Sequence, residues 1–273
     1  MQRNKQYVTL NNGVKIPNIG YGTWQIFNGH DAVDIFKEAV VQGYRHFDTA
    51  TLYENEKSLG KALNESSVHR EDFFITSKVL SKTKTYEGTI EAFNQSLKAL
   101  DIDYLDLYLI HGPSPIHDRN GNYDKENIEV WKALETLYNE GRVRAIGVSN
   151  FNVKALKNIM HHAKIRPMVN QIRYFAGYTQ DEIVAFCQSN DILIEGYSPL
   201  GVGKLLKNEW LKDIAFNHQV SAAQVAIKFC LQNNVLPLPK TQTPSRMKEN
   251  LMLDFTLSSE DMHTLKSIDD PLR

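Results

Sequence analysis

Short apolar runs alternate with longer amphipathic runs between residues 19 and 250 of the chain. The short runs are bounded by polar and turn-forming residues, a pattern typical of buried β-strands. In the longer runs apolar residues recur every three or four positions, as in Ile90, Phe93 and Leu97, and this spacing predicts helices with one buried face. The predicted strands are Asn18–Tyr21, Arg45–Thr49, Phe73–Lys78, Tyr104–His111, Val143–Asn150, Met168–Ile172, Leu193–Tyr197 and Leu236–Lys240.

Eight strands separated by helices predict a parallel sheet, because parallel neighbours need a crossover connection. In a chain of 273 residues, eight such units favour a closed (β/α)8 TIM barrel in one domain, residues 1–273. A doubly wound sheet is the alternative, and it would normally carry Gly-x-Gly-x-x-Gly after its first strand. The nearest run, Gly201-Val202-Gly203-Lys204, lacks the third glycine, so the barrel is the better prediction.

Three further segments lie outside this repeat. Tyr7–Leu10 and Val14–Pro17 flank the polar turn Asn11-Asn12-Gly13, which predicts a leading β-hairpin. Helical patterns near Asn208–Asn217 and Ser258–Ile268 predict two extra helices.

Composition and charge narrow the class of protein. The chain has 31 basic and 32 acidic residues and a formal charge of −1, without the surplus of clustered cations that nucleic-acid binding needs. It opens without a signal-peptide core, and no apolar run approaches the ~18 residues of a membrane span. We therefore expect a cytoplasmic protein that binds neither nucleic acid nor membrane, and that is a monomer.

The cysteines and adjacent histidines offer little chemistry. Cys187 and Cys230 lie in helical patterns, where buried free thiols are expected rather than a disulfide framework. His161 and His162 are adjacent on a predicted helix and point in different directions, which makes a poor metal site. No metal is expected.

Polar side chains gather at the carboxyl ends of the predicted strands. In a barrel these ends face the active-site mouth, so their convergence on one rim favours a catalytic site over isolated solvated or structural residues. Tyr53 follows five residues after Asp48, on the next loop. The strand-end residues are Asp48, Lys78, His111, Ser149, Asn150, Gln171, Tyr197 and Lys240.

An Asp, a Tyr, a Lys and a His at one rim suit the reduction of a carbonyl group. That reaction needs a hydride at carbon and a proton at oxygen, and a phenol with an ordinary pKa of about 10 can supply the proton. Lys78 would lower the pKa of Tyr53 by favouring the phenolate. Asp48 would keep Lys78 charged, while His111 would orient the carbonyl and share the proton transfer.

Three long segments carry a family resemblance. Gly43–Gly60, Arg144–Phe151 and Leu238–Asn250 resemble, in order, the three signatures of the aldo-keto reductases. The resemblance implies a (β/α)8 barrel whose leading hairpin plugs the bottom, with extra helices in the two places noted above. It also implies a catalytic tetrad of Asp48, Tyr53, Lys78 and His111, in which Tyr53 is the general acid.

The resemblance further implies an NADPH site. Nicotinamide contacts are expected at Thr23, Trp24, Ser149, Asn150, Gln171 and Tyr197, with the Tyr197 ring stacked on the nicotinamide. Ser198 and Leu200 would cover the pyrophosphate, and Lys240, Thr241 and Arg246 would grip the 2′-phosphate. Glu249 and Asn250 would contact the adenine. Trp24 and His111 would also bind the substrate. The cationic cluster itself suits a phosphate dianion, which favours NADPH over NADH.

Some positions depart from the family pattern. Gly112 stands where many relatives carry Trp, and Arg173-Tyr174-Phe175 follows Gln171 in place of the usual polar residues. The segment Gly112–Asn127 is expected to form a mobile flap. With Gly112 and a short carboxyl-terminal segment, we expect small aldehydes, α-dicarbonyls or keto-sugars to fit better than bulky steroids. The physiological substrate and the stereochemistry of the product stay open.

Two other functions stay open. A barrel of this kind could be a regulatory protein that binds NADP(H) without physiological turnover. It could also be a lyase that forms a Schiff base at Lys78.

Overall fold

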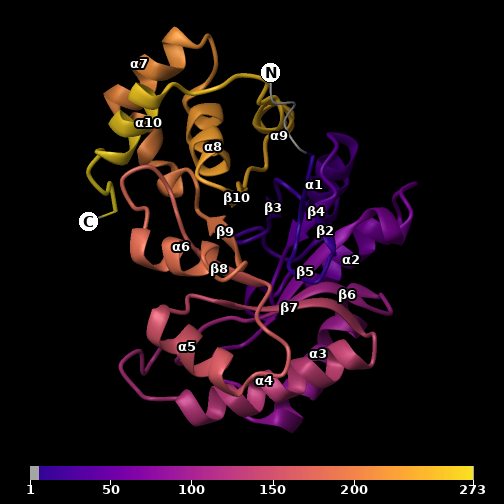
Figure 1. Ribbon diagram of the computed structural model, residues 1–273. Helices are drawn as coiled ribbons and strands as arrows, with labels where there is room; N and C mark the ends of the chain where they lie inside the picture. The colour runs from indigo at the N-terminus through magenta and orange to yellow at the C-terminus, as the bar shows by residue number, and fades with distance from the viewer. Residues whose placement is uncertain (1–5, 273) are drawn as a thin grey trace.

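The computed structural model describes residues 6–272, and its centre is a parallel sheet of eight strands in consecutive order (Figure 1). Helices surround this sheet in Figure 1. The strands are β3 Tyr21–Gly22, β4 His46–Asp48, β5 Phe74–Val79, β6 Leu105–Ile110, β7 Val143–Ser149, β8 Val169–Arg173, β9 Leu193–Tyr197 and β10 Val235–Leu238.

Backbone hydrogen bonds between the first and last strands close the barrel. The Gly20 and Gly22 N–H groups donate to the carbonyl oxygens of Pro237 and Pro239, each at 3.0 Å. A Cβ atom on Gly20 would lie 2.5 Å from Leu238 Cδ2 and 2.7 Å from His46 Nδ1, so a larger residue would force these side chains to shift. The predicted (β/α)8 barrel is thereby confirmed.

Helices follow the strands in the expected alternation. Polar caps mark several starts: the Ser221 and Ser258 side chains each form a capping box, and Thr85 accepts from the Gly88 N–H. The helices of the repeat are α1 His30–Val41, α2 Glu56–Asn64, α3 Tyr86–Leu100, α4 Asp124–Asn139, α5 Val153–His162, α6 Asp181–Gln188, α8 Ala222–Gln232 and α9 Pro244–Leu251. The two extra helices are confirmed as α7 Glu209–Asn217 and α10 Ser259–Lys266.

The predicted hairpin is also present, as antiparallel β1 Tyr7–Thr9 and β2 Lys15–Pro17. Its turn lies against the amino-terminal ends of the barrel strands. Asn11 Nδ2 donates to the carbonyl oxygens of Pro167 and Asp191, which precede β8 and β9. Asn12 Nδ2 donates to the Arg144 carbonyl in β7. The hairpin therefore lies at the end of the barrel opposite the predicted active site.

The first and last strands are displaced from the predicted ranges. The first begins at Tyr21 rather than Asn18, and the last ends at Leu238 rather than Lys240. Pro239 has no N–H to donate, so the regular strand ends before it, although its carbonyl still accepts from the Gly22 N–H. Lys240 consequently lies on the loop beyond the strand end.

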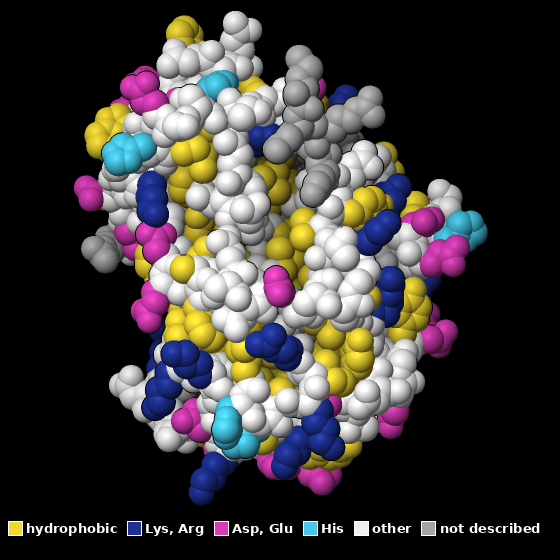
Figure 2. Space-filling view, in the orientation of Figure 1, with side chains coloured by type: hydrophobic (Ala, Val, Ile, Leu, Met, Phe, Trp, Pro, Cys, Tyr) yellow, Lys and Arg dark blue, Asp and Glu magenta, His cyan; other side chains and the backbone are white. Residues whose placement is uncertain are grey.

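Other sequence expectations are also addressed by the structure. Cys187 and Cys230 are buried and unpaired, as predicted. Among the described residues no helix is long and apolar enough to cross a membrane. On the face shown in Figure 2, basic and acidic side chains are interspersed.

Candidate active site

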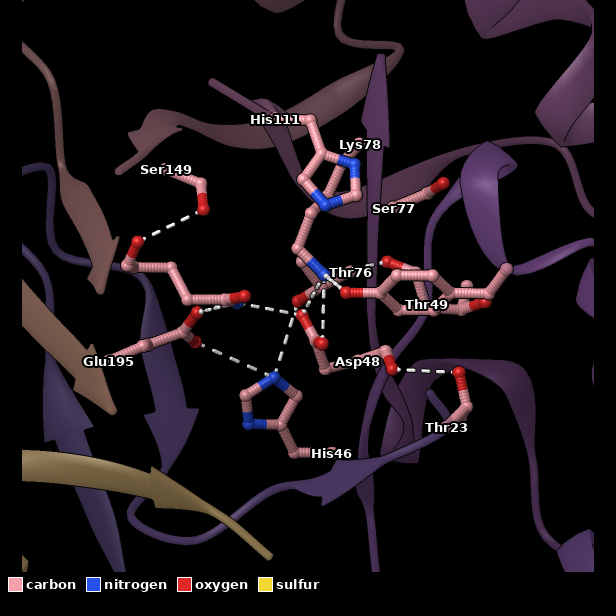
Figure 3. Close-up of polar contacts among 12 residues, drawn as sticks. Thr23, His46, Asp48, Thr49, Thr76, Ser77, Lys78, His111, Ser149 and Glu195 are labelled. Carbon is pink, nitrogen blue, oxygen red and sulfur yellow. Dashed lines mark hydrogen bonds and ion pairs between the residues drawn. The ribbon is translucent and has the colours of Figure 1, made fainter. Parts of the chain in front are cut away.

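The ammonium of Lys78 lies at the centre of the candidate site (Figure 3). Lys78 Nζ donates to Asp48 Oδ1 at 2.7 Å, to Asp48 Oδ2 at 2.8 Å, and to the Thr49 carbonyl at 2.9 Å. It also lies 3.2 Å from the hydroxyl of Tyr53, on the short turn Thr51–Tyr53 after β4. Lys78 has no exposed surface, so every polar contact of its ammonium is with protein. The structure thus brings three of the four predicted tetrad members together.

Opposing effects act on the charges of this cluster. Burial disfavours the Lys78 ammonium, but the Asp48 carboxylate and Tyr53 outweigh it, so the pKa of Lys78 is raised. Burial raises the pKa of Tyr53 to about 12, although Lys78 acts to lower it. The sequence predicted that Lys78 lowers the pKa of Tyr53. Lys78 does act in that direction, but burial has the larger effect, so the prediction of a lowered pKa was wrong.

His111, just beyond β6, is the fourth tetrad member. Its ring centroid lies 5.7 Å from that of Tyr53, in an edge-to-face arrangement. Burial, with a smaller effect of Lys78, lowers the pKa of His111 to about 3. At neutral pH the imidazole is therefore uncharged. Its buried Nδ1 makes no hydrogen bond with any residue from 6 to 272.

The predicted nicotinamide-binding residues form one hydrogen-bonded group on β7, β8 and β9. Ser149 Oγ donates to the Gln171 carbonyl at 3.0 Å, and Asn150 Nδ2 lies 3.1 Å from Ser149 Oγ. The Tyr197 hydroxyl donates to Asn150 Oδ1 at 2.9 Å. Asn150 also donates to the His111 carbonyl at 3.2 Å, which joins this group to the tetrad.

Trp24 and Thr23 have different surroundings. The Trp24 ring is half exposed, and its centroid is 4.9 Å from that of Tyr53, which places it at the rim of the site. Thr23 is buried, and its hydroxyl donates to the Asp48 carbonyl at 3.0 Å. The Thr23 side chain therefore supports β4, whereas the Trp24 ring is accessible at the rim, and cofactor contacts of both residues stay predictions.

The predicted phosphate-binding residues lie beyond β10 and in α9. Lys240 is half-buried and Arg246 is exposed, and neither forms an ion pair with any part of the chain that the structure describes. Thr241 is held by its carbonyl, which accepts from the Tyr21 hydroxyl. Glu249 is half-buried, whereas Asn250 has only 2% of its surface exposed. Two unpaired cations at this end fit the phosphate of a dinucleotide.

The loop after β9 has an unusual backbone. Ser198, Gly201, Val202 and Gly203 all have positive φ angles, and Val202 is a β-branched residue at φ 53°. A left-handed conformation at such a residue is costly and points to a functional constraint. Leu200, in the same loop, packs against the core.

The departures from the family pattern are structured. The Arg173 guanidinium lies 4.3 Å from the Tyr178 ring centroid, and Phe175 stacks on Tyr178. At the base of the segment 112–127, Lys84 Nζ donates to the Pro113 carbonyl at 3.0 Å and to Asn127 Oδ1 at 2.6 Å. This base is therefore fixed, and motion of the flap stays a prediction for the residues between these anchors.

Asn55 is a structural residue that no sequence pattern singled out. Its Nδ2 donates to the carbonyl oxygens of Thr23 and Ile26, and its Oδ1 accepts from the Thr49 hydroxyl. It thereby ties the loop that carries Trp24 to the loop that carries Tyr53.

Two buried ionisable residues below the tetrad were also missed. His46 and Glu195 precede Asp48 and Tyr197 by two positions on their strands. Side chains two apart in a strand point to the same face, so this spacing could have placed both in the barrel interior.

Residues 6–272 contain no group of three or more His, Cys, Asp or Glu side chains placed to hold a metal ion. His161 and His162 lie at the end of α5 with ring centroids 4.8 Å apart.

Comparison with known proteins identifies the family. The model of the aldo/keto reductase family matches residues 18–270. The chain is 44% identical to glyoxal reductase from Bacillus subtilis, over 97% of this chain and 93% of the relative. It is 37% identical to glycerol 2-dehydrogenase (NADP(+)) from Saccharomyces cerevisiae, over 96% of this chain and 90% of the relative.

A solved structure agrees with these relatives. An aldo/keto reductase from Brucella melitensis superposes with a TM-score of 0.89 at 42% identity, covering 96% of this chain and 99% of that one. The chain belongs to the aldo-keto reductase family, whose members are oxidoreductases.

Proposed function

We propose that this protein reduces small aldehydes and ketones to alcohols with NADPH, and that Tyr53 donates the proton. The observation that carries the proposal is the 3.2 Å contact between Lys78 Nζ and the Tyr53 hydroxyl, with Lys78 held by Asp48. This arrangement provides a phenol whose conjugate base is stabilised at the moment the proton leaves. The named relatives, a glyoxal reductase and an NADP(+)-dependent dehydrogenase, support the same reaction class.

Each residue has a defined task in this mechanism. NADPH, when bound, supplies the hydride that no protein side chain can supply. Tyr53 donates its proton to the carbonyl oxygen, and its raised pKa keeps the donor form populated throughout the neutral range. Lys78 stabilises the phenolate that remains. His111, uncharged at neutral pH, orients the carbonyl by donating a hydrogen bond rather than acting as a cationic acid.

The substrate would approach through an apolar rim. Trp24, Leu52, Ile116 and Val202 are exposed large hydrophobic residues, and all lie on loops that follow barrel strands. Such a rim suits the apolar side of an aldehyde or dicarbonyl. On the loop after β6, Gly112 itself contributes no side chain to this rim.

The function is tested by mixing the protein with NADPH and a panel of methylglyoxal, simple aromatic aldehydes, keto-sugars and a steroid ketone. We expect multiple turnovers, followed as loss of NADPH absorbance, with greater efficiency on the small carbonyls than on the steroid. A protein that binds NADPH but turns over none of the panel would support the regulatory alternative. A steroid preferred over methylglyoxal would overturn the substrate class while leaving the reaction intact.

The Schiff-base alternative fits the site less well. A lysine that attacks a carbonyl must be a free amine, and such lysines have lowered pKa values. The pKa of Lys78 is raised by Asp48 and Tyr53 instead. Borohydride trapping of a substrate adduct at Lys78 would favour the lyase.

Arg246→Ala is expected to weaken NADPH binding and to leave NADH binding nearly unchanged. A charge-assisted hydrogen bond to phosphate contributes roughly 1.5–3 kcal/mol, or about one to two decades in affinity. Because Arg246 is exposed, we expect the lower part of this range, and a smaller difference at high ionic strength.

The measurement is titration of both reduced cofactors against wild type and the variant. Lys248→Ala, at an exposed lysine of the same helix, is the matched control. Equal losses for NADPH and NADH in Arg246→Ala would assign Arg246 a structural role and remove the main support for NADPH preference.

A further inference from the structure

Glu195 is a fully buried carboxyl group with no place in the mechanism above. It lies in β9 beside Gln171 of β8, because the two strands pair these residues in register. A single nitrogen, Gln171 Nε2, donates to both Glu195 Oε2 and Asp48 Oδ1, each at 2.8 Å. Since the Asp48 carboxylate can only accept, this end of the side-chain amide is assigned as the nitrogen. Glu195 is thus connected to the residue that binds Lys78.

Few charged groups face Glu195. From β4 come Asp48 and His46, from β5 comes Lys78, and β8 contributes the uncharged Gln171. The neighbouring strand β10, Val235–Leu238, carries no ionisable side chain. Asp48 and Lys78 already neutralise each other. An ionised Glu195 would therefore leave an uncompensated charge in the barrel interior, unless His46 took up a proton.

The His46 side chain does not provide that compensation. Its Nε2 lies 3.6 Å from Glu195 Oε1, beyond hydrogen-bond distance, and 3.2 Å from Thr76 Oγ1 (Figure 3). Burial, followed by the effect of Lys78, lowers the pKa of His46 to about 3. Burial, followed by the Asp48 charge, raises the pKa of Glu195 to about 8. Both shifts favour the uncharged form of the group near neutral pH.

We propose that Glu195 is a positioning residue: in its neutral acid form it fixes Gln171 and Asp48 for the reaction, and its ionisation at alkaline pH weakens proton donation by Tyr53. This rests on the proposed carbonyl reduction. Both N–H groups of Gln171 are committed to Asp48 and Glu195, so the amide cannot rotate toward other partners. A second negative charge beside Asp48 would favour the protonated forms of Lys78 and Tyr53, which makes Tyr53 a poorer acid.

The first test is the pH dependence of hydride transfer. Wild type, Glu195→Gln and Glu182→Gln are mixed in single turnover with NADPH and a small aldehyde; Glu182 is an exposed control in α6. In wild type and the control we expect the rate to fall as the pH rises through about 8. A shift of about one unit in the pKa of Tyr53 gives a fall of roughly three- to tenfold.

Glu195→Gln keeps an oxygen acceptor for Gln171 but cannot ionise, so it should retain most activity at neutral pH and lack this fall. Glu195→Leu removes the acceptor and should lower the rate at every pH. Identical profiles for wild type and Glu195→Gln would overturn the proposal. Absence of any turnover in wild type would instead overturn the proposed function.

Protonation of Glu195 can be tested without turnover. The infrared difference between wild type and Glu195→Gln should show the carbonyl stretch of a protonated carboxylic acid at neutral pH, disappearing as the pH rises through about 8. If Glu195→Gln does not fold, the wild-type difference between neutral and alkaline pH reports the same band. Absence of the band would show that Glu195 is ionised and would overturn the proposal.

The pH dependence of protein stability provides a further check of the direction of the Glu195 pKa shift. The pKa of Glu195 is raised from 4.5 in the unfolded chain to about 8 in the folded one, so the folded chain holds this proton more tightly. The contribution of Glu195 to stability therefore decreases as the pH rises from about 4.5 to about 8. Glu195→Gln should show a smaller decrease over this range, and an unchanged pH dependence would contradict the assignment.

Discussion

Tyr53→Phe is expected to reduce carbonyl turnover by at least about 10²–10⁴-fold, the range for loss of a general acid. The substitution removes the proton donor and keeps the ring, which packs edge-on against Trp24 and His111. Cofactor affinity should stay close to wild type. Loss of kcat with unchanged NADPH binding identifies an interaction made in the transition state.

The experiment compares kcat and the NADPH dissociation constant for wild type, Tyr53→Phe and the control Tyr104→Phe. Tyr104 precedes β6, at the strand end opposite the site, and its ring lies 4.0 Å from the Arg70 guanidinium. Only Tyr53→Phe should lose turnover. If it keeps most of its activity, Tyr53 is not the proton donor. If NADPH affinity falls in parallel with kcat, the variant has damaged the site and does not test the acid.

Lys78→Met is expected to cost both activity and stability. Removing one partner of a buried ion pair leaves the other charge uncompensated, at a cost of roughly 3–5 kcal/mol in the free energy of unfolding. Lys78 has no exposed surface and Asp48 only 3%, so solvent does little to replace the lost partner. Turnover should fall because Tyr53 loses the cation that stabilises its phenolate.

The double variant Asp48→Asn/Lys78→Met separates the two effects. With both charges removed, stability should recover much of the loss, because a neutral pair in this position has no uncompensated charge. Activity should not recover. Urea unfolding of wild type, Asp48→Asn, Lys78→Met and the double variant gives the coupling free energy between Asp48 and Lys78. Additive destabilisation would show that the ion pair is not coupled as the distances imply.

The pH range of this stabilisation follows from the direction of the Lys78 shift. The folded-state pKa lies above the ordinary value of 10.5, so the contribution of Lys78 is complete at neutral pH. It is lost only as the pH rises through the folded-state value. A change of stability with pH near neutrality that disappeared in Lys78→Met would be inconsistent with this direction.

The sequence predicted the fold and the position of the tetrad by local rules. Alternating apolar and amphipathic runs gave the strands, and the carboxyl end of a parallel strand is where a barrel carries its chemistry. Asp48, Lys78 and His111 could therefore be placed on one rim before any contact was known. Their predicted roles rested on the family resemblance and stay proposals that the variants above test.

Strand boundaries and barrel closure depended on contacts between distant residues. The first and last strands approach each other closely, and a local sequence pattern does not encode this approach. It allows the N–H groups of Gly20 and Gly22 to donate to the carbonyl oxygens of Pro237 and Pro239. The position of Asn55 between two loops has the same origin.

The sequence by itself determined which ionisable groups face the site, because strand periodicity and strand ends are properties of neighbouring residues. Only the tertiary structure decided their charges. The pKa of Tyr53 is raised although Lys78 lies beside it, and the pKa of Glu195 is raised by burial in the barrel interior and by the nearby Asp48 charge. Desolvation sums over every group packed around a side chain, and most of those groups are far away in the sequence.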